Sequence, residues 1–220
     1  MWSLDSYLIA RDCGLRLTLT GTLSTTSPVV CSLRGGLITG ELRDAPAHPV
    51  SMHDALTRIL NTQRKADTVI PTGTRVYWGE DGQLSPDGEL RVTIDFGCVT
   101  GDSACFYFVS RKRMGGTPPV WNAYIMIAES IKRLYPDVRR VYVRELLLSH
   151  LQMSERNTKH MYDILTAPPV EVEYTEAELD AALKDIFNLM TIKSRSDRRK
   201  CRVGADPCPA YDICPVINEK

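Results

Sequence analysis

The sequence predicts an α/β sandwich with a mixed β-sheet. Two observations favour this class. Three segments with strand character lie between two amphipathic helical segments, and a nearly continuous apolar strand follows the second helix. The expected order is therefore helix, three-strand meander, helix, strand, with one further helix near the C-terminus.

The first helical segment, residues 3–13, can be capped by Ser3 and ends at Cys13. A second helix is predicted over residues 51–60 because its apolar side chains recur at helical spacing. His53 projects from the first turn of that helix. Both helices precede the predicted strands.

Strand character appears in residues 74–78, 89–96 and 104–110, with turn-rich sequence at 79–88 and 100–102. The first two segments read as a hairpin. The third is rich in aromatic and β-branched residues, which favour strands. We therefore expect an antiparallel meander.

After a Gly- and Pro-rich break, residues 120–134 show helical spacing of their apolar side chains, with Leu134 expected to face inward. Residues 138–148 then read as a central strand. The last helix, residues 176–190, follows a capping box formed by Thr175 and Glu178.

The chain has 220 residues, equal numbers of acidic and basic side chains (27 each) and 43% apolar residues. These values predict a single domain, 1–220, and exclude a protein whose overall charge steers it to nucleic acid. Within it we distinguish an N-terminal helix and cap (1–50), a core (51–150), C-terminal helices (151–200) and a cysteine tail (201–215). With no signal peptide or membrane span in the sequence, we expect a cytoplasmic protein without a membrane partner.

Seven cysteines, an odd number, are better interpreted as reduced thiols or metal ligands than as a disulfide framework. Cys201, Cys208 and Cys214 lie close together in a Pro-rich coil, where thiols pack poorly but bind soft metals well. Cys98 and Cys105 flank one turn and could face each other.

Several separated motifs share their order with one family: the helix ending at Cys13, His53 on the next helix, Asp95 closing a strand, Lys112 after the next strand, Tyr124 early in the following helix, and the closing cysteines. In these motifs the chain resembles the RecB-like, iron–sulphur branch of the PD-(D/E)XK nucleases, which includes CRISPR-associated adaptation exonucleases and phage relatives. The resemblance implies a restriction-endonuclease-like core. It also implies a Cys-ligated cluster that joins the N- and C-termini.

The same resemblance implies that Asp95 and His53 bind Mg²⁺ or Mn²⁺ and that Lys112 acts on the attacking water, with Tyr124 beside them. Ser110 stands where the family has its second carboxylate. A hydroxyl brings no negative charge, so the site is expected to hold Mg²⁺ weakly unless Glu129, Asp102 or Glu80 replaces the missing acid.

The basic residues Arg111 and Arg113 are candidates to contact nucleic acid. With Lys112 and four more cations they could form a phosphate-binding edge, or only a solvated turn. The four are Lys132, Arg133, Arg139 and Arg140. His53 on an amphipathic helix could equally be a hydrogen-bonded histidine without a metal.

For the cysteines, the resemblance implies a [4Fe-4S] cluster held by Cys13, Cys201, Cys208 and Cys214. A zinc ion on the same ligands and free thiols are the alternatives. The cluster would act structurally, as a clasp between the two ends of the chain.

Together these features predict a DNA-binding iron–sulphur protein that acts as a metal-dependent DNA exonuclease on DNA ends, with single-stranded DNA or ends as its partner and other subunits of a DNA-processing complex as further candidates. It could be phage-encoded and act in the host cytoplasm. The alternative is a catalytically inactive nuclease fold that serves as a DNA-binding or scaffolding subunit.

Overall fold

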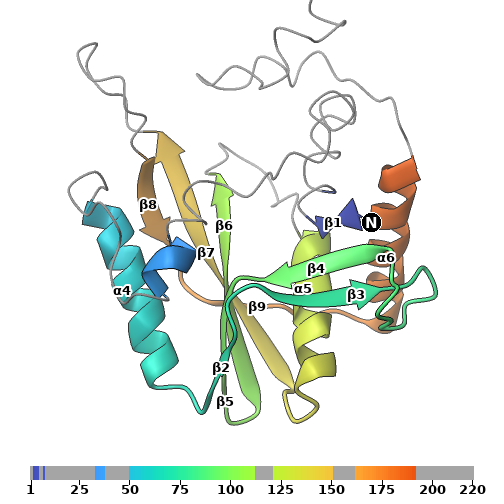
Figure 1. Cartoon of the computed structure of the whole chain (residues 1–220), viewed down its shortest axis with the longest axis horizontal. Helices are drawn as coiled ribbons and strands as arrows, with labels where there is room; N and C mark the ends of the chain where they lie inside the picture. The colour runs from blue at the N-terminus through green and yellow to red at the C-terminus, as the bar shows by residue number, and fades with distance from the viewer. Residues whose placement is uncertain are drawn as a thin grey trace, which may run out of the picture.

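The computed structural model describes residues 2–4, 7, 33–37, 50–111, 121–150 and 162–191 (Figure 1). Within these residues the elements follow in the order β1 (Trp2–Ser3), α4 (Val50–Arg64), β2 (Thr68–Ile70), β3 (Thr74–Trp78), β4 (Leu90–Ile94), β5 (Phe96–Thr100), β6 (Ser103–Arg111), α5 (Trp121–Leu134), β7 (Arg140–His150), β8 (Tyr162–Thr166), β9 (Val170–Glu171) and α6 (Glu176–Thr191). Residues 33–37 are also helical. The predicted α/β class with a mixed sheet is confirmed.

The larger sheet has the strand order β2-β5-β6-β7-β8, with β9 also paired to β7. Its pairs are antiparallel except for β6 and β7, which run parallel and are connected through α5. This agrees with the rule that parallel neighbours need a long crossover, here a helix. β7 therefore lies inside the sheet, as its apolar sequence predicts.

A second sheet has the order β1-β4-β3, and it continues the first. β2 leads into β3 through residues 71–73, and β4 leads into β5 through Asp95. Gly73 makes the first bend with a φ of 77°, a conformation that suits glycine, and its N–H donates to the carbonyl of Ile94 at 3.0 Å. The antiparallel pairs β2–β5 and β3–β4 thus form one long ribbon that bends beside Asp95.

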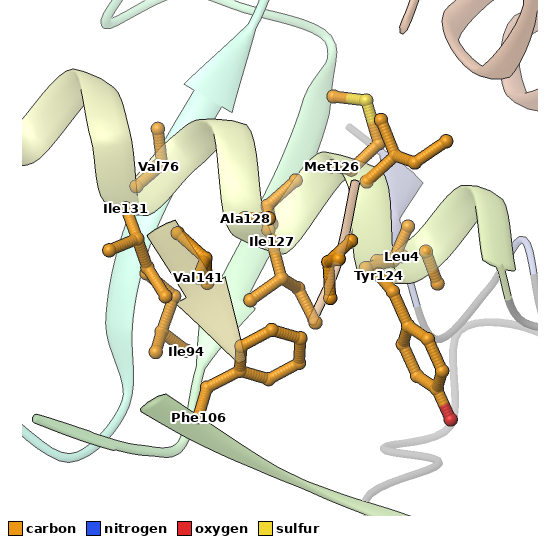
Figure 2. Packing of buried hydrophobic residues seen from close by; sticks show 14 of the residues in the cluster. Leu4, Val76, Ile94, Phe106, Tyr124, Met126, Ile127, Ala128, Ile131 and Val141 are labelled. Atoms are coloured by element: carbon orange, nitrogen blue, oxygen red, sulfur yellow. The ribbon is translucent and has the colours of Figure 1, made fainter. Parts of the chain in front are cut away.

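Helices cover both faces of the larger sheet (Figure 1). The helix α4 lies on one face, and α5 lies on the other with α6 packed against it. A large apolar cluster fills the space among the sheet, α5 and α6, and Figure 2 shows Phe106, Ile127 and Val141 within it. A smaller cluster under α4 contains Leu56, Phe96 and Tyr107 among others.

Most predicted helices and strands appear within one to four residues of their expected bounds, and β3 covers the predicted segment 74–78. The prediction of a single three-strand meander is wrong, because the segment 89–96 is divided at Asp95 into β4 and β5, which belong to different sheets and form the separate antiparallel pairs β3–β4 and β5–β6. Leu134 is an exception, because 40% of it is exposed at the end of α5 instead of facing inward. Ser3 is paired with Arg91 in a strand, although Leu4 and Tyr7 are helical as expected. The rest of the predicted first helix lies outside the described residues.

In the part of the chain that the structure describes, each helix is too short or too polar to cross a bilayer.

Candidate functional site

Asp95 occupies the one irregular position between β4 and β5. Ile94 packs in the large cluster on the α5 side, whereas Phe96 packs in the small cluster under α4. In an unbroken strand, the side chains at 92, 94 and 96 would share a face. The backbone must therefore rotate at Asp95, and this break brings a carboxylate to the margin of both cores.

The Asp95 carboxylate forms an ion pair with the Arg34 guanidinium. The two side chains are 24% and 30% exposed, so the pair is only partly hydrated. Leu33, fully buried in the cluster under α4, anchors the helical segment that carries Arg34. His53 is half-buried in the first turn of α4, next to the buried Met52 of the same cluster. The elements that bear His53 and Asp95 thus share one cluster.

Tyr124 is 2% exposed, and its hydroxyl donates a hydrogen bond to Oε1 of Glu145 in β7. Edge-to-face contacts fix the ring, at centroid distances of 5.1 Å to Phe108 and 5.9 Å to Trp121. Burial, followed by the bond to the carboxylate, raises the pKa of Tyr124 far above its usual range, so the phenol stays a donor. In Figure 2 its oxygen points away from the apolar cluster.

The carboxylates of Asp95 and Glu145 have partners next to different clusters. Asp95 precedes β5, whose first residue Phe96 pairs with Tyr107, and its carboxylate binds Arg34 beside the cluster under α4. Glu145 pairs with Phe108 of β6, and its carboxylate accepts the hydrogen bond from Tyr124 of α5.

Ser110 and Arg111 lie at the end of β6, paired with Leu147 and Leu148. Asp95, Glu145 and the end of β6 consequently belong to the same end of the sheet, opposite the β5–β6 turn. Lys112, Arg113 and the cysteines Cys13, Cys201, Cys208 and Cys214 lie outside the described residues.

The acids expected to compensate for Ser110 are placed elsewhere. Both oxygens of Glu129 are bound, by Arg133 at 2.7 Å and by Tyr174 at 2.6 Å. Asp102 lies in the turn at the opposite end of β5, bonded to Arg140 at 3.1 Å. Glu80 lines an open, acidic hollow of about 320 Å³ in the turn between β3 and β4. The structure therefore gives these three suggestions from the sequence no support.

The expected basic edge is largely neutralised by neighbouring groups. Arg133 and Arg140 form the ion pairs just described, and the Lys132 ammonium lies 4.4 Å from the centre of the Tyr174 ring. Each cation that is already paired is less available to a phosphate. The described part of this edge, which leaves out Lys112 and Arg113, therefore gives little support to phosphate binding.

Two thiols face each other under α4, as their spacing suggested. Cys98 pairs directly with Cys105 across the β5–β6 hairpin, and both are free cysteines. Burial raises the pKa of Cys98 and raises that of Cys105 to about 11, while the nearby Arg144 lowers both. Such thiols remain protonated and behave as packing residues.

Among the described residues there is no group of three or more His, Cys, Asp or Glu side chains arranged to hold a metal ion. Mg²⁺ does not need such a group, because it commonly binds one or two carboxylates together with water and substrate phosphate. Asp95 is a donor of that kind, and its oxygen chemistry fits a hard divalent cation.

Sequence reasoning missed Glu145. It is the single carboxylate in the apolar strand β7, and a buried charge without a partner is costly. That cost is the signal that could have marked Glu145, as it marked Asp95.

Comparison with known proteins adds no relative. No protein-family model matches the chain, and no curated protein matches it in sequence.

Proposed function

We propose that the chain is a metal-dependent nuclease of the PD-(D/E)XK type that acts on DNA ends. The observation that carries the proposal is the position of Asp95, at the bend of the β-ribbon and beside the strand that ends in Ser110 and Arg111. The element order supports it: α4 precedes the antiparallel pairs β3–β4 and β5–β6, and α5 then crosses to a parallel strand. This is the order expected for a nuclease core of this type.

A bound Mg²⁺ or Mn²⁺ would supply Lewis-acid chemistry at the scissile phosphate. Asp95 would hold the ion, with His53 as the proposed nitrogen ligand. Lys112 would stabilise the negative charge that develops on the phosphate. Arg111 and Arg113 would position the DNA backbone, a role that confers affinity without sequence specificity.

The proposed clasp between the chain ends has independent support. Tyr7 is fully buried, and its hydroxyl donates to Asp185 of α6 at 2.7 Å. Asn122 of α5 donates to the same carboxylate at 2.8 Å. The N-terminal segment and α6 therefore meet directly. In the sequence, Cys13 follows Tyr7, and Cys201 follows Asp185 of α6. A [4Fe-4S] cluster on Cys13, Cys201, Cys208 and Cys214 would therefore join two segments that start from neighbouring residues.

Cleavage of DNA with free ends tests the function. The full chain, purified without oxygen, is incubated with Mn²⁺ or Mg²⁺ and either end-labelled linear DNA, single- or double-stranded, or closed circular DNA. We expect linear DNA to be degraded and circular DNA to survive. Asp95→Asn should lower the rate at least ~100-fold. The matched control Asp137→Asn changes an exposed acid in the turn after α5 and should cleave normally.

Intact linear DNA, with metal and cluster both bound, would reject the nuclease proposal. The cluster is measured on the same sample: absorbance near ~400 nm with bound iron indicates [4Fe-4S], whereas a colourless protein with stoichiometric zinc indicates the zinc alternative.

One observation favours the second candidate, a nuclease fold that binds DNA or holds a complex together without cutting. The Arg34 guanidinium already neutralises Asp95, where a metal ion would otherwise do so. This candidate predicts that the wild-type protein binds DNA ends but leaves them intact. Cleavage gained by Ser110→Glu would support it, since the change restores the acid that the family pattern has at this place.

A further inference from the structure

We propose that the α5 side of the larger sheet binds one unpaired base of single-stranded DNA. Phe108 and Trp121 stack on the base, and Glu145 accepts a hydrogen bond from its edge. Tyr124 is the positioning residue of Glu145. The inference rests on the proposed function, because it names the part of the DNA end that the protein holds.

The side chains of this surface are held around one buried tyrosine. Residues paired directly across a sheet point to the same face, so Glu145 of β7 lies beside Phe108 of β6. Phe108 and Trp121 are half-buried and pack against the large cluster. Each ring contacts Tyr124 edge to face, at centroid distances of 5.1 Å and 5.9 Å. Two partly exposed aromatic rings and a carboxylate therefore share one rigid support.

Glu145 keeps one oxygen that can accept a hydrogen bond from a ligand. Tyr124 donates to Oε1, and among the described residues neither a hydrogen bond to Oε2 nor an ion pair of Glu145 is recorded. A half-buried carboxylate in the apolar strand β7 is costly unless a donor reaches it. The amino group of a base is a donor of this kind.

Exposed apolar surface adjoins Glu145 on the same face. Leu147 follows Glu145 by two residues along β7 and pairs with Leu165 of β8, which is 58% exposed. Because alternate residues of a strand share a face, both leucines lie on the side of Glu145. Apolar and aromatic surface beside one acceptor suits the flat, weakly hydrated face of a base, whereas a phosphate group would be repelled by the carboxylate.

The open carboxylate oxygen predicts a preference among the bases. An ionised carboxylate accepts hydrogen bonds and donates none. Cytosine carries the amino group N4 where thymine carries the carbonyl oxygen O4, so cytosine offers a donor and thymine an acceptor. We therefore expect the surface to prefer cytosine.

Oligonucleotide binding tests the surface without relying on cleavage. Fluorescence anisotropy, without added divalent metal, measures the affinity of the full chain for labelled oligo(dC) and oligo(dT) of equal length. We expect the wild type to bind oligo(dC) at least ~5-fold more tightly. Glu145→Gln should abolish this preference. Trp121→Ala should weaken the binding of both oligonucleotides about 10-fold, because it removes a stacking ring.

Each variant has a matched control on α5. Glu129→Gln removes an acid that also binds a tyrosine, and Tyr135→Ala removes a half-buried ring that packs against the same cluster near the other end of the helix. Both controls should bind as the wild type does. If Glu145→Gln does not fold, Tyr124→Phe keeps the ring packing and should itself reduce the preference for oligo(dC), because it frees the Glu145 side chain. Trp121→Phe keeps a stacking ring and should retain most of the affinity.

The outcomes separate the two proposals. Equal binding of oligo(dC) and oligo(dT) by the wild type, or a preference that survives Glu145→Gln, overturns the base-binding surface, and the nuclease function still stands if linear DNA is degraded. A wild-type protein that prefers oligo(dC) but leaves DNA intact supports the surface and rejects the nuclease. A wild-type protein that neither binds oligonucleotides nor cuts DNA overturns both.

Discussion

Each half of α5 takes part in a hydrogen bond between a tyrosine and a glutamate. In the first turn, Tyr124 of the helix donates to Glu145 of β7. In the second half the roles are exchanged, and Tyr174, just before α6, donates to Glu129 of the helix at 2.6 Å. Arg133 binds the other oxygen of Glu129 one turn later. The same pair of residue types, tyrosine and glutamate, thus occurs twice. Both oxygens of Glu129 are bonded, whereas Tyr124 bonds one oxygen of Glu145.

The difference suggests how one kind of contact can serve two purposes. At Glu129 both carboxylate oxygens are bonded, one by Arg133 of α5 itself and one by Tyr174, which fastens the residue just before α6 to α5. At Glu145 the hydroxyl fixes the carboxylate and leaves it capable of another interaction. The first arrangement fastens two elements through both oxygens of one carboxylate, and the second does so through one oxygen.

The largest expected effect on stability is at Glu129. Glu129→Ala removes two hydrogen bonds to a carboxylate that is 14% exposed, and should lower the free energy of unfolding by about 2–4 kcal/mol. Glu145→Ala removes one such bond and relieves the desolvation of a charge, so about 1–2 kcal/mol is expected. Urea denaturation measures both. A larger loss for Glu145→Ala than for Glu129→Ala would contradict the comparison.

The contrast between these networks also marks what the sequence could predict. Helical and strand periodicity located α4, β3, β6, α5, β7 and α6, because each has an apolar pattern that can be recognised in the local sequence. The strands β2, β8 and β9 were not predicted. They are defined by pairing with β5 and β7, and pairing between distant segments leaves little trace in local sequence.

Among the candidate site residues, Asp95 could be identified because a carboxylate in an apolar strand needs a reason. Its partner Arg34 could not be, since 61 residues separate the two. Glu145 escaped notice although its sequence surroundings are similar. Glu129 appeared suitable as a replacement acid because the sequence does not show its two partners. The fold brings Tyr174 and Arg133 to its carboxylate, and each binds one oxygen.

The next effect in size concerns the hydroxyls themselves. Tyr124→Phe and Tyr174→Phe each leave a partly buried carboxylate with one donor fewer, and each should cost about 1–2 kcal/mol in urea denaturation. Tyr135→Phe is the matched control, because no hydrogen bond to its half-buried hydroxyl is recorded among the described residues. A cost at Tyr135 equal to that of the other two would show that ring packing, and not the bond, is being measured.

Alkaline pH should weaken both networks together. Burial and the adjacent carboxylates raise the pKa values of Tyr124 and Tyr174 above their ordinary 10.0. The unfolded chain therefore releases these protons first, so the stabilisation is complete below pH ~10 and is lost as pH rises further. Cys105, raised from 9.0 to about 11, adds a decline that starts near pH 9.

Urea midpoints measured from pH 8 to 11 check this dependence. Tyr124→Phe and Tyr174→Phe should each flatten the decline above pH ~10, and Cys105→Val should flatten its beginning. Midpoints of the wild type that stay constant across this range would be inconsistent with the raised pKa values.

The smallest effect is expected at the opposite end of the sheet, where Asp102 and Arg140 form an ion pair at 3.1 Å with side chains 50% and 54% exposed. The guanidinium lowers the pKa of Asp102, so its contribution is present above the ordinary carboxyl pKa of 3.8 and is lost as pH falls below it. Water and salt screen such a pair, and the urea midpoint of Arg140→Gln should match that of the wild type at neutral pH. A clear loss of stability in Arg140→Gln would mean that exposure does not decide how much these charges contribute. The stronger effects expected at Glu129 and Glu145 would then need another cause than their burial.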